Sequence, residues 1–421
     1  MNIMRVGGLT AIAAGARLLS GFLVIKLVSI FSGPEGVAKL GQFMSLMALL
    51  VVFAGGGVGP GVVKYVAEYR ENSGQLKSFL NTSTLFTLVA SCLMAVAVLC
   101  FGEPLSAWLF GDLDYLSLIW IVAFAQIFVA FHNLVVAIIN GMMDIRRLAI
   151  IHVAGAALGL TITALLGFYF RLYGALLAFI LGQAALILIS FPLFRKSRNF
   201  DWRFFYPKFD SGNFKRLSKF TLMTLTSALL APVVQIAVRN HLAQEFSWEE
   251  TGYWQSVSKV SEAYLLFLTM AINVYYLPKL SAITDPDRFK AELINAYRYL
   301  MPAVILSALA IYVLRDYVTL FLFTGDFAAA NSLYAPQLIG DVIKIASFVL
   351  SYIMLAKALT FTFFLSELAF SAMYVGWVWV LTERYGLIGA MYAFIVNYVI
   401  YLLFTCVVAT SVLKKMRYGK S

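Results

Sequence analysis

Charged side chains are scarce in this chain. They make up 13% of its 421 residues, whereas 62% of the residues are hydrophobic; soluble domains contain roughly 25% and 45–50% respectively. A soluble globular protein is therefore excluded, and the sequence predicts an integral membrane protein. Cysteine is also scarce: Cys92, Cys100 and Cys406 lie inside apolar runs without the spacing of metal ligands. We therefore expect no disulfide framework, no metal and no cofactor.

Long apolar runs fill most of the sequence. A membrane helix needs about 20 apolar residues, and these runs lack the polar alternation of barrel strands. Gly and Pro mark several breaks between them, as in Ser32-Gly33-Pro34-Glu35, where they end a helix. The sequence predicts an all-α membrane protein with about 12 transmembrane helices, near residues 8–32, 38–62, 80–101, 116–140, 147–169, 173–194, 218–240, 252–277, 296–314, 334–356, 361–382 and 387–412.

Lys and Arg are distributed unevenly between the two sides of these spans. If the N-terminus is cytoplasmic, 23 of the 32 basic residues lie on the cytoplasmic side and five on the other, among them Lys39 and Arg239. The positive-inside rule then predicts that both termini are cytoplasmic. The net charge of +11 is interpreted as this topology signal and as attraction to anionic membrane lipids, not as nucleic-acid binding.

An internal repeat divides the chain. Three landmarks recur at offsets of 212 or 213 residues: Gln42 and Gln255, Leu109-Phe110-Gly111-Asp112 and Leu322-Phe323-Thr324-Gly325-Asp326, and Tyr173-Gly174 and Tyr385-Gly386. This order predicts two pseudo-symmetric six-helix bundles around a central cavity. We expect an N-terminal lobe at 1–194, a basic cytoplasmic linker at 195–217 lying on the membrane surface, a C-terminal lobe at 218–413 and a basic cytoplasmic tail at 414–421.

Seven charged side chains fall inside the predicted spans: Arg17, Lys26, Lys259, Glu262, Asp341, Lys344 and Glu367. Facing lipid, they would together cost roughly 20 kcal/mol, more than the 5–15 kcal/mol by which a typical fold is stable. They must therefore pair, reach the interface or line a wet cavity. The pairs Lys259/Glu262 and Asp341/Lys344 are three residues apart and could each neutralise locally.

Arg17 has no acidic partner on its own helix and lies near mid-span, so we expect it to line the cavity, while Lys26 could instead reach the interface. A weakly cationic cavity suits an anionic cargo, and the planar guanidinium suits phosphate. Glu262, Asp341 and Glu367 could couple transport to protons or balance charge; the alternative for Glu367 is a hydrogen bond between helices. His132 and His152 could relay protons or only pack. The absence of a Walker-type loop argues against ATP hydrolysis.

Several segments resemble the Wzx-type flippases of the multidrug/oligosaccharidyl-lipid/polysaccharide exporter superfamily, and within it the lipid III flippase family of enterobacterial common antigen synthesis. The segments span most of the chain in order: Ser32-Gly33-Pro34-Glu35-Gly36, Val63-Lys64-Tyr65-Val66-Ala67-Glu68-Tyr69, Ser218-Lys219-Phe220-Thr221-Leu222-Met223, Gly252-Tyr253-Trp254-Gln255, Ser261-Glu262-Ala263-Tyr264, Gly340-Asp341-Val342-Ile343-Lys344 and Ala356-Lys357-Ala358.

The resemblance implies a transporter, not an enzyme. Its cargo would be an undecaprenyl-diphosphate-linked oligosaccharide, an O-antigen or common-antigen repeat unit, moved from the inner to the outer leaflet of the bacterial inner membrane by alternating access. The glycan polymerase and chain-length regulator are implied partners beside membrane lipids. The family's cavity charges match Arg17, Lys26, Lys259, Lys344 and Lys357 for cargo, with Glu262, Asp341 and Glu367 for coupling. The alternatives are a small-molecule or drug/ion antiporter of the same superfamily, a major-facilitator transporter and a membrane enzyme of glycan assembly.

Overall fold

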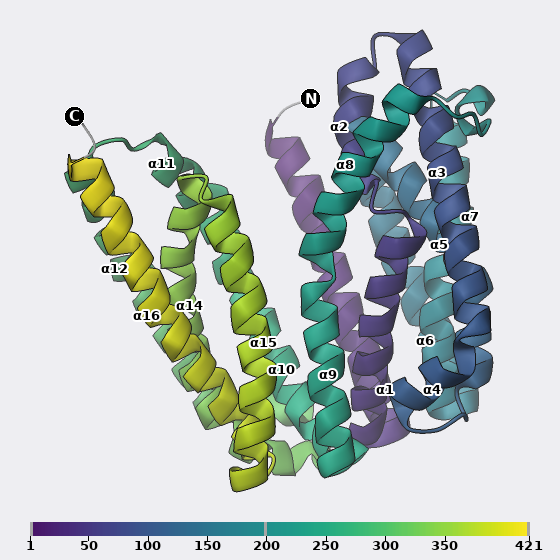
Figure 1. Cartoon of the computed structure of the whole chain (residues 1–421). Coiled ribbons are helices and arrows are strands. Elements are labelled where there is room, and N and C mark those ends of the chain that lie inside the picture. Colours follow the sequence, from purple (N-terminus) through teal and green to yellow (C-terminus); the bar gives the residue numbers. More distant parts are fainter. Residues whose placement is uncertain (1–2, 198–199, 419–421) are drawn as a thin grey trace. The chain divides into compact units, whose positions relative to one another are not determined.

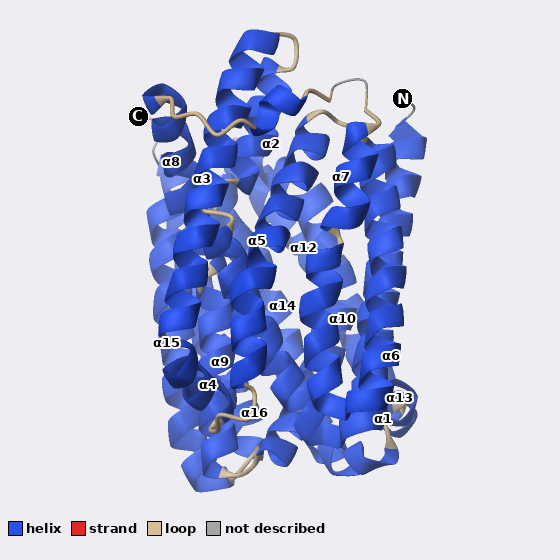
Figure 2. Cartoon of the chain, turned by 90° about the vertical axis from the view of Figure 1, so that its right-hand side faces the viewer, coloured by secondary structure: helices blue, strands red, loops and turns tan. Residues whose placement is uncertain are grey.

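The computed structural model describes residues 3–197 and 200–418, and every element in these ranges is a helix (Figure 2). The predicted all-α class is confirmed. Of the predicted basic segments, Arg198 in the linker and Lys420 in the tail lie outside the described residues. The helices up to the linker are α1 (Ile3–Ala54), α2 (Gly59–Tyr69), α3 (Ser73–Cys100), α4 (Gly102–Phe110), α5 (Leu116–Gly141), α6 (Ile145–Ala185) and α7 (Ile187–Arg195).

The linker contains one short 3-10 helix, η1 (Trp202–Phe205). A π-helical turn, η2, and a second 3-10 helix, η3, interrupt the helices that follow. These are α8 (Ser211–Ala228), α9 (Leu230–Glu245), α10 (Trp248–Ala271), η2 (Ile272–Tyr276), α11 (Leu277–Ala282), α12 (Pro286–Val313), α13 (Arg315–Leu322), η3 (Gly325–Leu333), α14 (Tyr334–Ala356), α15 (Thr360–Tyr385) and α16 (Ile388–Tyr418).

Two of the longest helices are each interrupted by a residue with positive φ. In α1 the residue is Gly33 (φ 61°, ψ −158°), which is followed by Pro34. In α6 it is Arg171 (φ 49°, ψ −128°). Each interruption separates two membrane-spanning lengths. Helix α1 covers the first predicted span and the second as far as Ala54, eight residues before its predicted end at 62, and α6 with α7 covers the fifth and sixth.

Eight helices among the described residues are long and apolar enough to cross a membrane, and two of them are these interrupted ones. The seventh and eighth predicted spans correspond to α8 with α9 and to α10. These helices carry more polar residues because they hold Lys219, Arg239, Lys259 and Glu262.

The chain forms two compact units. Unit 1 comprises Met1–Ser32 and Lys39–Ile236, and unit 2 comprises Gly33–Ala38 and Ala237–Ser421. In unit 1, α5 packs on α2, α3 and α6. Helix α2 buries Val62, Val66 and Tyr69, a spacing that places one apolar face against Phe79 and Ile138,.

In unit 2, α14 is the central helix and packs against α12 and α16, while α15 packs along α16 (Figure 1). Its residues Ile345, Val349 and Tyr352 are buried at helical spacing, and the last two contribute to an apolar cluster with Phe289 of α12 and Val412 of α16. The lobe limits inferred from the sequence, 1–194 and 218–413, stay a prediction.

Candidate cargo-binding and coupling residues

Arg17 of α1 contacts a histidine of α6. Its Nη2 lies 2.7 Å from Nδ1 of His152, and Ser20, one turn along α1, donates to the carbonyl oxygen of Ala156 at 3.0 Å. A guanidinium only donates hydrogen bonds, so the imidazole nitrogen that faces it must be unprotonated. The Arg17 side chain is exposed within unit 1.

Lys26 and His132 complete the titratable groups predicted inside the spans of this unit. Lys26 is half-buried on α1, nine residues after Arg17. His132 is buried, and its Nδ1 lies 2.9 Å from the hydroxyl of Ser190 on α7. That contact fits the packing role that was one of its two interpretations.

Lys259 and Glu262 form the ion pair that their spacing on α10 predicts. The Lys259 Nζ donates to the Glu262 Oε2 at 2.6 Å, with 24% of the lysine and 49% of the glutamate side chain exposed. The two opposite charges thus offset each other, and both side chains remain accessible to solvent or to a ligand. A phosphate oxygen arriving at Lys259 would compete with the carboxylate of Glu262.

Asp341 is fully buried on α14 and accepts hydrogen bonds from three side chains. Ser261 donates to its Oδ1 at 2.6 Å, Gln337 donates to the same oxygen at 3.0 Å, and Tyr264 donates to its Oδ2 at 2.9 Å. Ser261 and Tyr264 lie on α10, so the carboxylate joins α10 to α14. Hydrogen bonds of this kind compensate the cost of burying a carboxylate.

Lys344 and Glu367 both contact aromatic residues of α16. The Lys344 Nζ lies 5.6 Å from the ring centroids of Phe394 and of Tyr398, a cation–π arrangement. Glu367 Oε1 on α15 accepts a hydrogen bond from the hydroxyl of Tyr401 at 3.2 Å. This is the helix-to-helix hydrogen bond that was the alternative interpretation of Glu367. Among the described residues, Asp341 and Lys344 are thus bonded to other groups and not to each other.

Lys357 lies in the turn between α14 and α15. Its Nζ donates to the carbonyl oxygen of Ile283 at 2.7 Å and lies 4.8 Å from the ring centroid of Phe289. Burial lowers the pKa of the Lys357 ammonium below its ordinary value. One of the three N–H groups of this ammonium is bonded to a main-chain oxygen,. The role of Lys357 in cargo binding stays a prediction.

Two basic residues that the sequence assigns to external loops are in fact buried. Lys39 is 6% exposed, with its Nζ 4.0 Å from Asp112 Oδ2 and 5.0 Å from the ring centroid of Tyr115. Arg239 is 2% exposed, and its Nε donates to Gln255 Oε1 at 2.6 Å. Gln255 is a landmark of the internal repeat, which was the one signal in the sequence that pointed to this position.

Comparisons with known proteins show the family of this chain. A family model described as "Polysaccharide biosynthesis protein" matches residues 37–332. The lipid III flippases of Escherichia coli (strain K12) and Shigella flexneri are each 34% identical to this chain over 415 residues, which is 96% of this chain and 98% of each relative. The chain belongs to this family of polysaccharide biosynthesis proteins. The predicted resemblance to polysaccharide flippases is confirmed.

Solved structures share the fold of this family member. A multidrug resistance MATE family transporter of the MOP superfamily, in its inward-facing conformation, superposes with a TM-score of 0.77 at 14% identity, covering 95% of this chain and 96% of that one. The lipid II flippase MurJ, in an inward closed conformation, gives a TM-score of 0.72 at 16% identity, covering 98% and 90%. At these identities the likeness concerns the fold, which is that of transporters.

Proposed function

We propose that this protein is a flippase that moves an undecaprenyl-diphosphate-linked oligosaccharide, an O-antigen or common-antigen repeat unit, from the inner to the outer leaflet of the bacterial inner membrane. The observation that carries the proposal is the 34% identity to the lipid III flippases over nearly the whole of both chains. Transport proceeds by alternating access, without catalysis. Both termini are cytoplasmic, and the glycan polymerase and chain-length regulator act on the delivered product.

The charges of the two units support an anionic cargo. The predicted spans of unit 1 hold the cations Arg17 and Lys26, and the contact that Arg17 makes is with a neutral imidazole. In unit 2 one of the lysines, Lys259, is opposed by a carboxylate at 2.6 Å. The diphosphate therefore meets the stronger cationic excess on α1, where the Arg17 guanidinium can hold two phosphate oxygens at once.

The other predicted cargo-binding and coupling residues differ in the contacts that their charged groups already make. Lys259 and Lys344 bind cargo as exchangeable cations, since one faces a movable carboxylate and the other faces aromatic rings. Glu262 balances charge when cargo is absent. Asp341 and Glu367 couple transport to protons, because a carboxylate that gains a proton becomes a donor and must release one of the side chains that donate to it, such as Tyr264 or Tyr401,.

The membrane potential favours export. With the cytoplasm negative by 100 mV, outward movement of one negative charge gains about 2.3 kcal/mol. The obstacle to spontaneous movement is the polar oligosaccharide, which the lipid interior excludes. A hydrated path for the sugar would remove this obstacle, while the polyprenyl chain stays in lipid.

The second candidate is a small-molecule or drug/ion antiporter, which the likeness to the multidrug resistance transporter favours. Its cargo would be cationic and would require an excess of carboxylates. In unit 1 the predicted spans contain no Asp or Glu, so this candidate requires that its cargo be bound in unit 2 alone.

Complementation tests the proposal. A strain that lacks its lipid III flippase and other Wzx proteins receives wild type, Arg17→Ala, Arg17→Lys, or Arg171→Ala as a control arginine outside the spans. Surface glycan and accumulated lipid-linked precursor are measured, together with the amount of inserted protein. Rescue by wild type and by Arg171→Ala, with precursor accumulating for Arg17→Ala, is expected. Wild type that rescues neither common-antigen nor O-antigen export would overturn the proposal.

A further inference from the structure

The linker follows a fixed path along the start of α3. Four consecutive polar residues of that helix are buried: Asn81, Thr82, Ser83 and Thr84. Thr84 Oγ1 donates to the linker carbonyl oxygen of Phe204 at 3.3 Å, and the backbone N–H of Lys208 donates to the carbonyl oxygen of Asn81 at 3.5 Å. Asn81 and Thr84 thus hold the linker backbone against α3, whereas Ser83 donates to the carbonyl oxygen of Phe79 within the helix.

Two further hydrogen bonds extend this attachment on either side. Thr82 Oγ1 donates to the carbonyl oxygen of Lys208 at 3.2 Å, and Asn213 Nδ2 of α8 donates to Ser78 Oγ at 3.2 Å. The linker is thus joined to α3 at both ends of the segment that holds Lys208, Phe209 and Asp210. A cavity bounded by these two pieces of chain is preformed.

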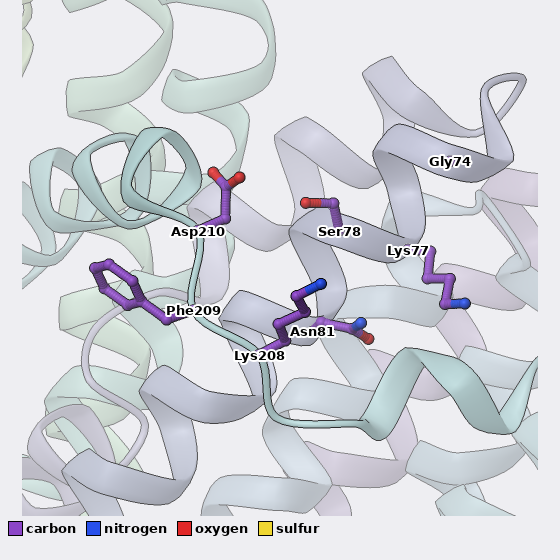
Figure 3. Close-up of a pocket in the computed structure, with 7 residues that line it drawn as sticks. All are labelled: Gly74, Lys77, Ser78, Asn81, Lys208, Phe209 and Asp210. Atoms are coloured by element: carbon purple, nitrogen blue, oxygen red, sulfur yellow. The ribbon is translucent and has the colours of Figure 1, made fainter.

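Such a cavity lies between the linker and the first two turns of α3, within unit 1 (Figure 3). Its volume is about 230 Å³, many times the roughly 15 Å³ that one water molecule requires. A group with several oxygen atoms fits. The residues that line it are Gly74, Lys77, Ser78, Asn81, Lys208, Phe209 and Asp210.

The lining favours an anion. It offers two ammonium groups, Lys77 and Lys208, the Ser78 hydroxyl and the positive end of α3 at Gly74,. The opposing charge is Asp210, whose Oδ1 accepts the backbone N–H of Asn213 at 2.8 Å and so caps α8; the two lysines leave the lining with one positive charge in excess. Lysines with a hydroxyl donor at a helix N-terminus are a combination that binds phosphate oxygens.

The surroundings of the cavity point to a lipid as the source of the phosphate. Three aromatic side chains of the linker are exposed: Trp202 by 51%, Tyr206 by 64% and Phe209 by 59%. Aromatic residues of this kind are enriched at the level of lipid headgroups. Lys77 lies in the first two turns of α3, eight residues before Leu85, where the apolar part of that helix begins.

We propose that this cavity binds the phosphate of an anionic glycerophospholipid, whose acyl chains lie beside the linker aromatics. The site is separate from the cargo residues and does not depend on the identity of the cargo. A bound lipid would fasten the linker to α3 and to the membrane surface together.

The test measures lipid binding to the full-length protein in a neutral detergent. Phosphatidylglycerol is titrated, and the dissociation constant of the most tightly held lipid is measured by native mass spectrometry. Lys77→Gln with Lys208→Gln is compared with Lys196→Gln with Lys215→Gln, which removes the same charge from the same face outside the cavity. In separate arms, phosphatidylcholine replaces phosphatidylglycerol and inorganic phosphate is added as a competitor.

The cavity variant should bind phosphatidylglycerol about 30-fold more weakly, as expected for two lost lysine contacts, while the control variant stays within twofold of wild type. Added phosphatidylglycerol should raise the unfolding temperature of wild type and of the control only. Equal weakening in both variants, or in neither, would overturn the proposal. Protection by inorganic phosphate without binding of phosphatidylglycerol would assign the cavity to free phosphate and overturn the lipid source.

Discussion

The guanidinium of Arg17 lies 2.7 Å from the Nδ1 atom of His152, which joins α1 to α6 through a cation and a neutral acceptor. This contact forms only while that ring nitrogen is free of a proton. Protonation of His152 would place two positive charges in contact and release Arg17 from α6.

The effect of a substitution at His152 on export should therefore depend on whether the new side chain can accept a hydrogen bond from Arg17. His152→Gln keeps an acceptor for Arg17 and should retain most of the surface glycan. His152→Lys places a permanent cation there, and two like charges 4 Å apart cost about 4 kcal/mol at an effective dielectric constant of 20, so we expect more than a tenfold loss of export. Glycan blots normalised to inserted protein measure both. Equal activity of the two variants would contradict a role for the contact.

A substitution at Lys259 should mainly reduce export, and a substitution at Glu262 should have little effect on stability. An exposed ion pair contributes about 0–1 kcal/mol, so Glu262→Gln should change the thermal unfolding temperature little. Lys259→Gln should reduce export more than tenfold, since the cargo phosphate loses a cation. The charge-swapped double variant, Lys259→Glu with Glu262→Lys, serves as the control. Full export by the swapped protein would show that only the pair matters and not the position of the lysine.

The stability of Asp341 variants should depend on how many of the three side chains that donate to Asp341 keep an acceptor. Asp341→Ala leaves the donors of Ser261, Tyr264 and Gln337 without their acceptor, at about 1–3 kcal/mol for each one left unsatisfied. Asp341→Asn keeps one oxygen and should unfold at a temperature between those of wild type and the alanine variant. The matched control is Tyr264→Phe, which removes one donor and leaves the carboxylate.

Export by the folded Asp341→Asn protein then tests proton coupling independently of stability. The asparagine cannot exchange a proton, so export driven by an imposed pH gradient should be lost. Gradient-driven export that matches wild type would remove Asp341 from the coupling residues.

Substitutions at Arg171 and at Gly386 should change the unfolding temperature in opposite directions. Both hold a positive φ in a turn between two helices, 49° and 67° respectively, and such a backbone costs a residue with a Cβ about 1–3 kcal/mol. Arg171→Gly should therefore raise the unfolding temperature, and Gly386→Ala should lower it. Arg171→Lys keeps both the charge and the strain and should leave stability unchanged. A lysine variant as stable as Arg171→Gly would attribute the effect to loss of the guanidinium side chain and not to the backbone.

Lys357 should affect stability more than transport. Its ammonium donates to the carbonyl oxygen of Ile283, and a hydrogen bond that involves a charged group contributes about 1.5–3 kcal/mol. Lys357→Met should lower the unfolding temperature while export per folded molecule stays within twofold of wild type. Export that falls further than the amount of folded protein would return Lys357 to the cargo-binding residues.

The sequence predicted the helical class and the positions of the spans because continuous apolar runs and Gly/Pro breaks are local signals. It placed one repeat landmark imprecisely. Tyr173-Gly174 was matched with Tyr385-Gly386, whereas the turn geometry matches Arg171 with Gly386 and Gly174 with Gly389, a separation of 215 residues in each case. A Cβ at Gly174 would collide with the carbonyl oxygen of Leu166, and a Cβ at Gly389 with that of Leu381.

The candidate site was predictable only in part. The Lys259–Glu262 pair follows from spacing on one helix, but the partners of Asp341 lie up to 80 residues away on α10. The burial of Lys39 and Arg239 was missed for a related reason. A count of loop charges assumes that a basic residue near a helix end faces water, and it does not detect the neighbouring helix that covers the residue.

The six residues Gly33–Ala38 belong to unit 2, although the rest of α1 belongs to unit 1, and the stretch up to Ile236 belongs to unit 1 although it follows the linker. Cutting the gene within the linker would therefore not yield two self-sufficient proteins. Each fragment would carry a piece of the other's core and would fold only by reassociation. Co-expressed halves should restore export together, and either half made alone should be degraded.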